Sequence, residues 1–311
     1  MDKIGFEFDR ETDEFLGALK EGTRRVYRAG LTNFQDFYGK TPKYFLDVLE
    51  EDLRRPRREK LRVARNTFKG FVEWMQKKDL TPKTIRSYVA AVQSMAAYFD
   101  IIITTRYVNL PDAAAISKKF PWTIETITKL MGMIENPELQ SAAVTIFQSG
   151  IGIKDLLLLT YSDIKYEYEH QTIPLCLDLS RHKTKVKFMT FIGTWGVTLL
   201  RQHLQGHKLN LDTPIYSTSH RTIDDKFQML AKEFVGKYNG RNPIRPHTLR
   251  AAFRTLLGDA GMDRDAVKFL MGQKLPEQDK VYLSRSRQGW RDYYKKYEYA
   301  LTPENWKEKL I

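Results

Sequence analysis

Apolar side chains recur at helical spacing through roughly the first hundred residues. The first stripe lies between Thr23 and Gly39, at intervals of four, three and four positions: Tyr27, Leu31, Phe34 and Tyr38. This spacing places them on one face of a helix. Similar stripes predict helices from Thr41-Pro42 to Leu53, from Arg58 to Lys78 (Leu61, Ala64, Phe68, Phe71, Val72 and Met75), and from Thr81-Pro82 to Phe99. The pattern predicts a compact bundle of four or five helices.

The second half of the chain is also mainly helical in pattern. Between the Gly150-Ile-Gly152 corner and Tyr161, a dense apolar run predicts one buried helix. The other predicted helices are Thr123 to about Ile134, Glu138 to Ser149, Trp195 to Leu204, Ile223 to Val235, His247 to Asp259, Arg264 to Met271, and a last one from about Trp290.

One segment of the second half follows the two-residue period of a strand instead. Residues 172–179 alternate, and residues 186–192 are rich in β-branched and aromatic side chains. Between them lies the basic stretch Ser180-Arg181-His182-Lys183-Thr184-Lys185. The pattern predicts a β-hairpin with a basic tip.

Proline-bracketed residues without a sustained period separate the two halves. We expect a helical domain over residues 1–110, a linker at 111–121, and a second domain over 122–311 that ends in a C-terminal tail helix. The fold class predicted is mainly α with a small β-hairpin, α+β.

The net charge of the chain indicates which class of molecule it binds. Lys and Arg outnumber Asp and Glu by 51 to 38, which gives a net charge of +13 and a pI near 9.5. Such a balance favours nucleic acid over a membrane surface, since no apolar run is long enough to span a bilayer, although a merely soluble basic protein is the plain alternative. The lone Cys176 and an N-terminus without a secretory pattern indicate the cytoplasm.

Arginines cluster in the first half, in the run Arg54-Arg55-Pro56-Arg57-Arg58. Four adjacent guanidinium groups repel one another unless anions are near, and a phosphate backbone supplies anions. The alternative is the solvated face of a helix. We take the cationic candidates for DNA binding to be Arg54, Arg55, Arg57, Arg58, Arg62, Arg65, Lys185 and Arg245.

His247 and Arg250 stand three residues apart, one helical turn, just after Pro246. The spacing points a proton-transfer group and a cation the same way, although a capped surface helix would produce the same pattern. An ordered set extends this pair: Lys183, His247, Arg250, Gln273 and Tyr282.

These residue types suit phosphodiester chemistry without a metal. A tyrosine hydroxyl attacks phosphorus, cations stabilise the non-bridging oxygens, and His and Lys move protons. His203 and His207 have metal-ligand spacing but no evident third ligand, so a surface pair is favoured and no metal is expected. Tyrosines 293, 294, 297 and 299 are rival nucleophiles, or more simply a packing stripe.

The stretch from Arg245 to Gly261, followed by residues 265–272 and Tyr282, resembles the tyrosine recombinases, particularly archaeal and archaeal-virus integrases. The resemblance covers nearly the whole chain. It implies a core-binding domain, a linker and a catalytic domain, double-stranded DNA as the partner, a homo-tetramer on paired DNA sites, and no cofactor. In that family a C-terminal segment docks on a neighbouring subunit, and Trp290 to Ile311 is long enough to do so.

The resemblance also implies roles. Tyr282 matches the nucleophile that forms a 3′-phosphotyrosyl bond, His247 the proton-transfer histidine, and Arg250 the second phosphate-binding arginine. Lys183 matches the hairpin lysine that protonates the leaving oxygen, with Lys185 an alternative in register. Asp155 matches the acidic residue that follows the first arginine.

Two positions depart from the family pattern. Gly152 stands where the first arginine belongs, and Gln273 replaces a common histidine; its amide donates hydrogen bonds but moves no protons. Lys154, two residues after Gly152, is expected to face elsewhere on a helix.

The sequence therefore supports an integrase or site-specific recombinase. The main alternative is a DNA-binding protein of the same fold with impaired or lost catalysis, and a nucleoid-like DNA coater is a third. Gly152→Arg is expected to raise formation of a covalent adduct with DNA if the pocket is otherwise intact.

Overall fold

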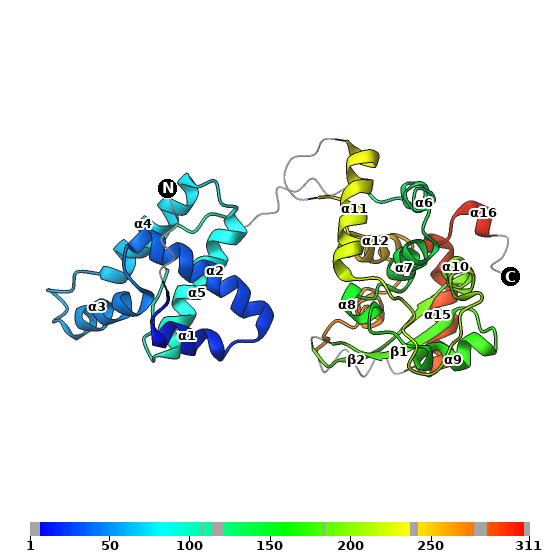
Figure 1. Cartoon of the computed structure of the whole chain (residues 1–311), viewed down its shortest axis with the longest axis horizontal. Helices are drawn as coiled ribbons and strands as arrows, with labels where there is room; N and C mark the ends of the chain where they lie inside the picture. The colour runs from blue at the N-terminus through cyan, green and yellow to red at the C-terminus, as the bar shows by residue number, and fades with distance from the viewer. Residues whose placement is uncertain are drawn as a thin grey trace. The chain divides into compact units, whose positions relative to one another are not determined.

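A computed structural model describes residues 7–106, 108–112, 121–182, 184–236, 242–276 and 285–307. The chain divides into two compact units, Met1–Ile116 and Ser117–Ile311 (Figure 1). The division falls inside the predicted linker, of which residues 113–120 lie outside the described residues. Within the described ranges, no helix combines the length and apolar character needed to cross a membrane.

Unit 1 is the predicted helical bundle. Its core is aromatic, with Phe34 in edge contact with Phe45 and Phe71 at ring-centroid distances of 5.0 and 5.2 Å. The described helices are α1 (Arg10–Gly17), α2 (Glu21–Tyr38), α3 (Pro42–Arg54), α4 (Val63–Lys77) and α5 (Pro82–Tyr98), with α2 packed along α5.

The fourth helix of this bundle begins later than its apolar stripe predicts. α4 starts at Val63, and Leu61, expected on the buried stripe, is 57% exposed. The cause is Asp52, a buried residue whose two carboxylate oxygens accept the backbone N–H groups of Leu61 and Val63 at 2.6 and 3.1 Å. These hydrogen bonds hold residues 55–62 as a loop and cap the helix.

Unit 2 surrounds a buried helix. In α7 (Pro137–Ser149) every residue from Ser141 onward is buried, because α10 (Thr194–Leu204), α12 (Pro246–Asp259) and the sheet all pack on it. Other described helices of this unit are α6 (Ile124–Gly132), α11 (His220–Val235), α13 (Arg264–Leu270), α15 (Arg287–Tyr297), the 3-10 helix η1 (Glu298–Leu301) and α16 (Glu304–Lys307).

The single helix predicted for residues 153–161 is wrong. The chain instead forms the short α8 (Ile153–Leu156), and after a break α9 (Tyr161–Glu169) begins. Thr160 is extended, since it forms a β-bridge with Pro214 and its backbone N–H is held by the Asp163 carboxylate at 2.8 Å. Long-range pairing therefore overrides the continuous apolar pattern.

The predicted β-hairpin is confirmed as a two-stranded antiparallel sheet. β1 (Leu175–Ser180) pairs with β2 (Lys187–Ile192), with Leu175 opposite Ile192 and Ser180 opposite Lys187. Leu175 and Leu177 face the core. The basic tip lies between the strands, so it projects from the packed part of the sheet. The chain is mainly α with this small sheet, as predicted.

The segment from Trp290 does not form a free tail up to Leu301. Trp290, Tyr294 and Leu301 are buried in the core of unit 2, and the Tyr294 hydroxyl donates to the Gln148 carbonyl at 2.8 Å. These residues complete their own unit, and Thr302, Pro303 and Trp306 after them also pack on it, so docking of the C-terminal segment on a neighbour stays a prediction.

Candidate active site

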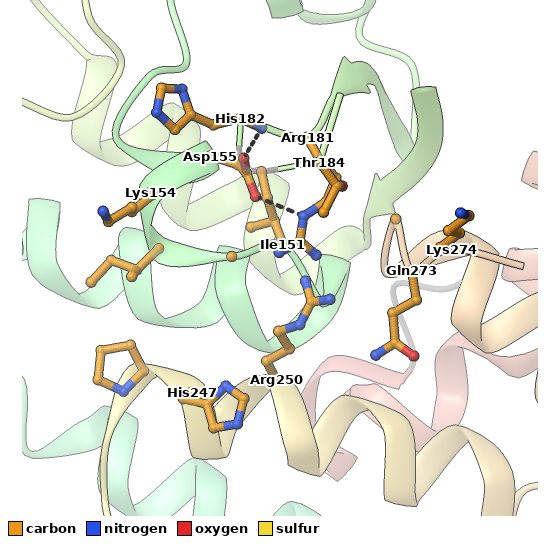
Figure 2. A pocket seen from close by; sticks show the side chains of 14 residues that line it. Ile151, Lys154, Asp155, Arg181, His182, Thr184, His247, Arg250, Gln273 and Lys274 are labelled. Atoms are coloured by element: carbon orange, nitrogen blue, oxygen red, sulfur yellow. Dashed lines mark hydrogen bonds and ion pairs between the residues drawn. The ribbon is translucent and has the colours of Figure 1, made fainter. Parts of the chain in front are cut away.

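Four segments distant in sequence meet at a pocket of about 490 Å³ in unit 2 (Figure 2). They are the start of α8, the hairpin tip, the first turn of α12 and the residues after α13. Arg181, His247 and Arg250 are among the basic residues that line this cavity, together with Lys154, His182 and Lys274.

Arg250 is buried in the pocket wall, only 7% exposed. Its Nη1 donates to the carbonyl of Gly150 and its Nη2 to the carbonyl of Met271 at 2.7 Å. These two residues cap the C-termini of α7 and α13, where carbonyls lack helical partners and attract cations. Two helix ends therefore fix the guanidinium group.

Gly150 is required for this arrangement. Its φ of +62° is in the left-handed region, and a Cβ there would lie 2.5 Å from the ring of Phe253. Only glycine allows the chain to turn here while its carbonyl accepts from Arg250.

Burial and, to a smaller extent, the nearby charge of Arg181 lower the pKa of Arg250 to about 10, against the opposing effect of the Asp155 carboxylate. Arg250 therefore remains protonated at neutral pH. An anion in the pocket would relieve the unfavourable charge.

Arg181, which the sequence marks only as part of the basic tip, is the second arginine of the pocket. Its Nη1 donates to the Met271 carbonyl at 2.9 Å, and its Nε lies 3.3 Å from an oxygen of Asp155. In Figure 2 the guanidinium groups of Arg181 and Arg250 point toward each other.

Asp155 anchors the hairpin tip to α8. One of its carboxylate oxygens pairs with Arg181, and the other accepts the backbone N–H of His182 at 2.8 Å. The carboxylate is buried. This residue therefore sets the position of Arg181 and of the tip.

Gly152 lines the same pocket. A Cβ built on it would lie 2.9 Å from an oxygen of Asp155 and 3.5 Å from Nη2 of Arg181. Lys154 lies at the exposed rim of the pocket, and Figure 2 shows its side chain pointing away from the two guanidinium groups.

His247 and Gln273 line the pocket from different elements. His247 is exposed in the first turn of α12, and Gln273 is half-buried after the end of α13. Lys183 and Tyr282 lie outside the described residues. Their predicted roles therefore stay predictions.

Two further candidates do not line the pocket. Lys185 is exposed with a φ of +56°, and its backbone N–H closes the tip turn on the carbonyl of Arg181 at 2.8 Å. Arg245 precedes α12, and its backbone N–H is held by the Thr248 hydroxyl at 2.9 Å. The tip turn thus presents Arg181 to the pocket and Lys185 to solvent.

The arginine run of unit 1 is less uniform than its sequence suggests. Arg54 pairs with Glu50 at 2.7 Å and Arg55 with Glu51 at 3.1 Å, one helical turn away in each case. Glutamate carboxylates therefore supply nearby anions for these two arginines, and the predicted role of the run in DNA binding stays a prediction. Arg57, Arg58 and Arg62 are exposed in the loop before α4, and Arg65 is half-buried on that helix.

The alternative tyrosines and the histidine pair lie elsewhere. Burial raises the pKa of Tyr294 well above its usual value, and none of the four tyrosines between residues 293 and 299 lines the pocket. His203 places Nε2 2.9 Å from the Ile215 carbonyl and stacks on Tyr216. Tyr294 and His203 therefore have packing roles, whereas Tyr299 and His207 are exposed.

Comparisons with known proteins agree on the fold. The chain is 21% identical to tyrosine recombinase XerD of Listeria innocua, over 92% of this chain and 97% of that protein. It is 23% identical to tyrosine recombinase XerA of Saccharolobus solfataricus, over 86% of this chain and 84% of that protein. Because relatives are both bacterial and archaeal, an archaeal or viral origin stays a prediction.

Solved integrases have the same architecture. A complex of the Tn1549 transposon integrase with a circular intermediate DNA matches with a TM-score of 0.61 at 16% identity, over 92% of this chain and 98% of that one. A lambda integrase dimer bound to a core site matches with a TM-score of 0.60 at 14% identity, over 89% of this chain and 95% of that one.

The sequence also matches the phage integrase family over residues 123–288, which is more than half of the chain. This protein therefore belongs to the phage integrase family of tyrosine recombinases.

Proposed function

We propose that this protein is a DNA integrase or site-specific recombinase that cuts and rejoins DNA through a 3′-phosphotyrosyl intermediate. The observation that carries the proposal is Arg250, a buried cation fixed by two helix ends and open to a pocket that His247 shares. A rigid guanidinium group of this kind suits the charge that builds on a phosphate under attack.

The proposed reaction exchanges one phosphoester for another. The Tyr282 oxygen attacks phosphorus, the bond to the 5′ oxygen breaks, and that oxygen leaves as a hydroxyl protonated by Lys183. Arg250 and the Gln273 amide stabilise the non-bridging oxygens, and His247 assists proton transfer. A 5′-hydroxyl of another strand then attacks the phosphotyrosine, which restores Tyr282. Since the ester energy is conserved, the scheme needs neither a metal nor a nucleotide.

Double-stranded DNA is the proposed partner. The net charge of +13 favours it, and the integrase structures of similar fold contain DNA. We propose that unit 1 contacts the backbone through Arg57, Arg58 and Arg62, with smaller contributions from Arg54, Arg55 and Arg65. A homo-tetramer on paired sites, acting in the cytoplasm, completes the proposal.

The second candidate function is DNA binding without recombination. Gly152 favours it, because one of two phosphate cations is absent from its usual place. Loss of such a group typically lowers turnover about a hundredfold to a thousandfold when nothing replaces it.

A covalent trapping experiment separates the two functions. Binding sites are first selected from a pool of random duplexes, and nicked duplexes are then built on the enriched sequence so that cleavage releases a short fragment. The recombinase forms an SDS-stable protein–DNA adduct that is absent from Tyr282→Phe and retained by Tyr299→Phe, a tyrosine outside the pocket. The proposed reaction is refuted if the wild type binds the DNA tightly but forms no adduct. It is also refuted if Tyr282→Phe forms as much adduct as the wild type.

A further inference from the structure

Gly152, which has no side chain, lies beside Arg181. Nη2 of Arg181 is 3.5 Å from the point where a Cβ of residue 152 would start. This guanidinium group comes from the hairpin tip, 29 positions later in the chain. The guanidinium group of Arg181 therefore lies beside position 152.

Two contacts and partial burial hold Arg181 there. Nε is ion-paired with Asp155 at 3.3 Å, Nη1 donates to the Met271 carbonyl at 2.9 Å, and the side chain is only 19% exposed. Nη2 has no hydrogen-bond partner among the described residues. Arg181 thus keeps N–H donors for a ligand in the pocket.

Gly272 leaves the space through which Arg181 passes. A Cβ at Gly272 would lie 2.7 Å from Cδ of Arg181 and 2.8 Å from the ring of Phe188. Both glycines that flank the guanidinium group, Gly152 and Gly272, therefore leave room for it.

Arg181 and Arg250 converge on one acceptor. Both donate to the carbonyl of Met271, at 2.9 and 2.7 Å, so the two cations lie close together. Asp155 is the single carboxylate among the residues that line the pocket within the described chain. Two fixed guanidinium groups with one counter-charge favour a bound anion.

We propose that Arg181 replaces the arginine that Gly152 lacks, and that Arg181 and Arg250 together bind the non-bridging oxygens of one phosphate diester. The identification of that phosphate as the scissile phosphate of DNA rests on the proposed function. The two-arginine anion site itself does not depend on turnover.

The first test measures binding of inorganic sulfate, a tetrahedral dianion that stands in for the phosphate, by NMR or calorimetric titration of the full chain. Arg181→Ala is expected to weaken sulfate binding at least tenfold, and Arg181→Lys to weaken it less. The matched control is Arg287→Ala, because Arg287 pairs with Asp178 of β1 at 3.1 Å outside the pocket. It should change the affinity less than twofold.

Two results overturn the proposal. One is wild-type sulfate affinity in Arg181→Ala. The other is used if Arg181→Ala does not fold. In that case the proposal is overturned if Arg181→Lys, which keeps the charge, binds sulfate as tightly as the control Arg287→Ala.

The second test moves the arginine. Gly152→Arg alone is expected not to raise adduct yield, because the new Cβ would lie 2.9 Å from Asp155 and Arg181 occupies the space beyond it. This outcome differs from the one expected from sequence. In the double variant Gly152→Arg with Arg181→Ala, Asp155 is released to pair with the introduced arginine, and sulfate affinity should recover at least threefold over Arg181→Ala.

The two readouts separate this inference from the proposed function. If the wild type forms no DNA adduct but Arg181→Ala loses sulfate binding, the recombinase activity is refuted and the two-arginine site stands. If Gly152→Arg alone strengthens sulfate binding and adduct formation while Arg181→Ala changes neither, Arg181 does not replace the missing group.

Discussion

The two arginine clusters of this protein have the same chemistry and opposite surroundings. In unit 2, Arg181 and Arg250 are held by helix-end carbonyls and a buried carboxylate. In unit 1, Arg54 and Arg55 are 76% and 40% exposed and pair with glutamates on their own helix. The first cluster is a preorganised site, whereas the second is mainly a charged surface.

The difference shows why a fixed guanidinium group binds a phosphate better than an exposed one does. An exposed ion pair on a helix contributes a few tenths of a kcal/mol and is screened by salt. A guanidinium group fixed on backbone carbonyls has already lost its conformational freedom, so a phosphate gains its hydrogen bonds without that entropic loss. Counting arginines in the sequence does not separate these two cases.

The largest effect is expected for Arg250→Ala. It removes the buried cation and leaves the Gly150 carbonyl without this donor, at about 1–3 kcal/mol, whereas the Met271 carbonyl still accepts from Arg181. Adduct formation should fall about a hundredfold to a thousandfold, and sulfate binding should vanish. Denaturant unfolding measures the loss of stability, the adduct assay measures the loss of cleavage, and titration measures sulfate binding. Arg54→Ala is the control, and equal effects in the two variants would contradict the comparison.

Gly272→Ala should have the next largest effect. Its φ of +61° costs an L-residue about 1–2 kcal/mol, and the new Cβ would displace Arg181. We expect lower thermal stability and sulfate affinity reduced several fold. Gly258→Ala is a matched control inside α12, where a Cβ meets nothing within 4 Å and stability should rise by about 0.5–1 kcal/mol. Unchanged sulfate binding in Gly272→Ala would contradict this role.

The pH dependence tests the environment of Arg250 directly. Because its pKa is lowered to about 10, its ¹³Cζ NMR signal should titrate near that pH. A lowered pKa disfavours the charged form in the folded state, so its unfavourable contribution to stability declines once the pH rises above about 10, where the folded state releases the proton before the unfolded state does. Sulfate binding, which needs the cation, should weaken over the same range, and bound sulfate should raise the midpoint. A midpoint that stays above 12 without sulfate would contradict this.

The smallest effects are expected in unit 1. Replacing Arg54 and Arg55 by Ala should lower DNA affinity only slightly, because Glu50 and Glu51 already compensate them. Replacing Arg57 and Arg58 should reduce the slope of log affinity against log salt by about 2, if each contacts one phosphate. Filter binding over a salt series measures both pairs. Equal slopes in the two double variants would mean that ion pairing does not distinguish them.

Local patterns in the sequence determined most of the elements. The stripes around Phe34 and Phe68 and the alternation in β1 predict helices and a hairpin, because each depends on a period that a few neighbouring residues define. His247 and Arg250 line one pocket as their one-turn spacing implies. The pairing of Arg54 with Glu50 was also readable, since a spacing of four residues on a helix brings opposite charges together.

Only the tertiary structure decided what stands at Gly152. Arg181 reaches the pocket because Asp155, 26 positions earlier, and Met271, 90 positions later, hold its guanidinium group, and because Gly272 leaves it room. The break between α8 and α9 has the same origin in pairing with Pro214. These contacts join residues far apart in the chain, and no local period records them. The sequence, through its family resemblance, predicts that an arginine is missing at position 152, whereas the packed structure places the guanidinium group of Arg181 beside that position.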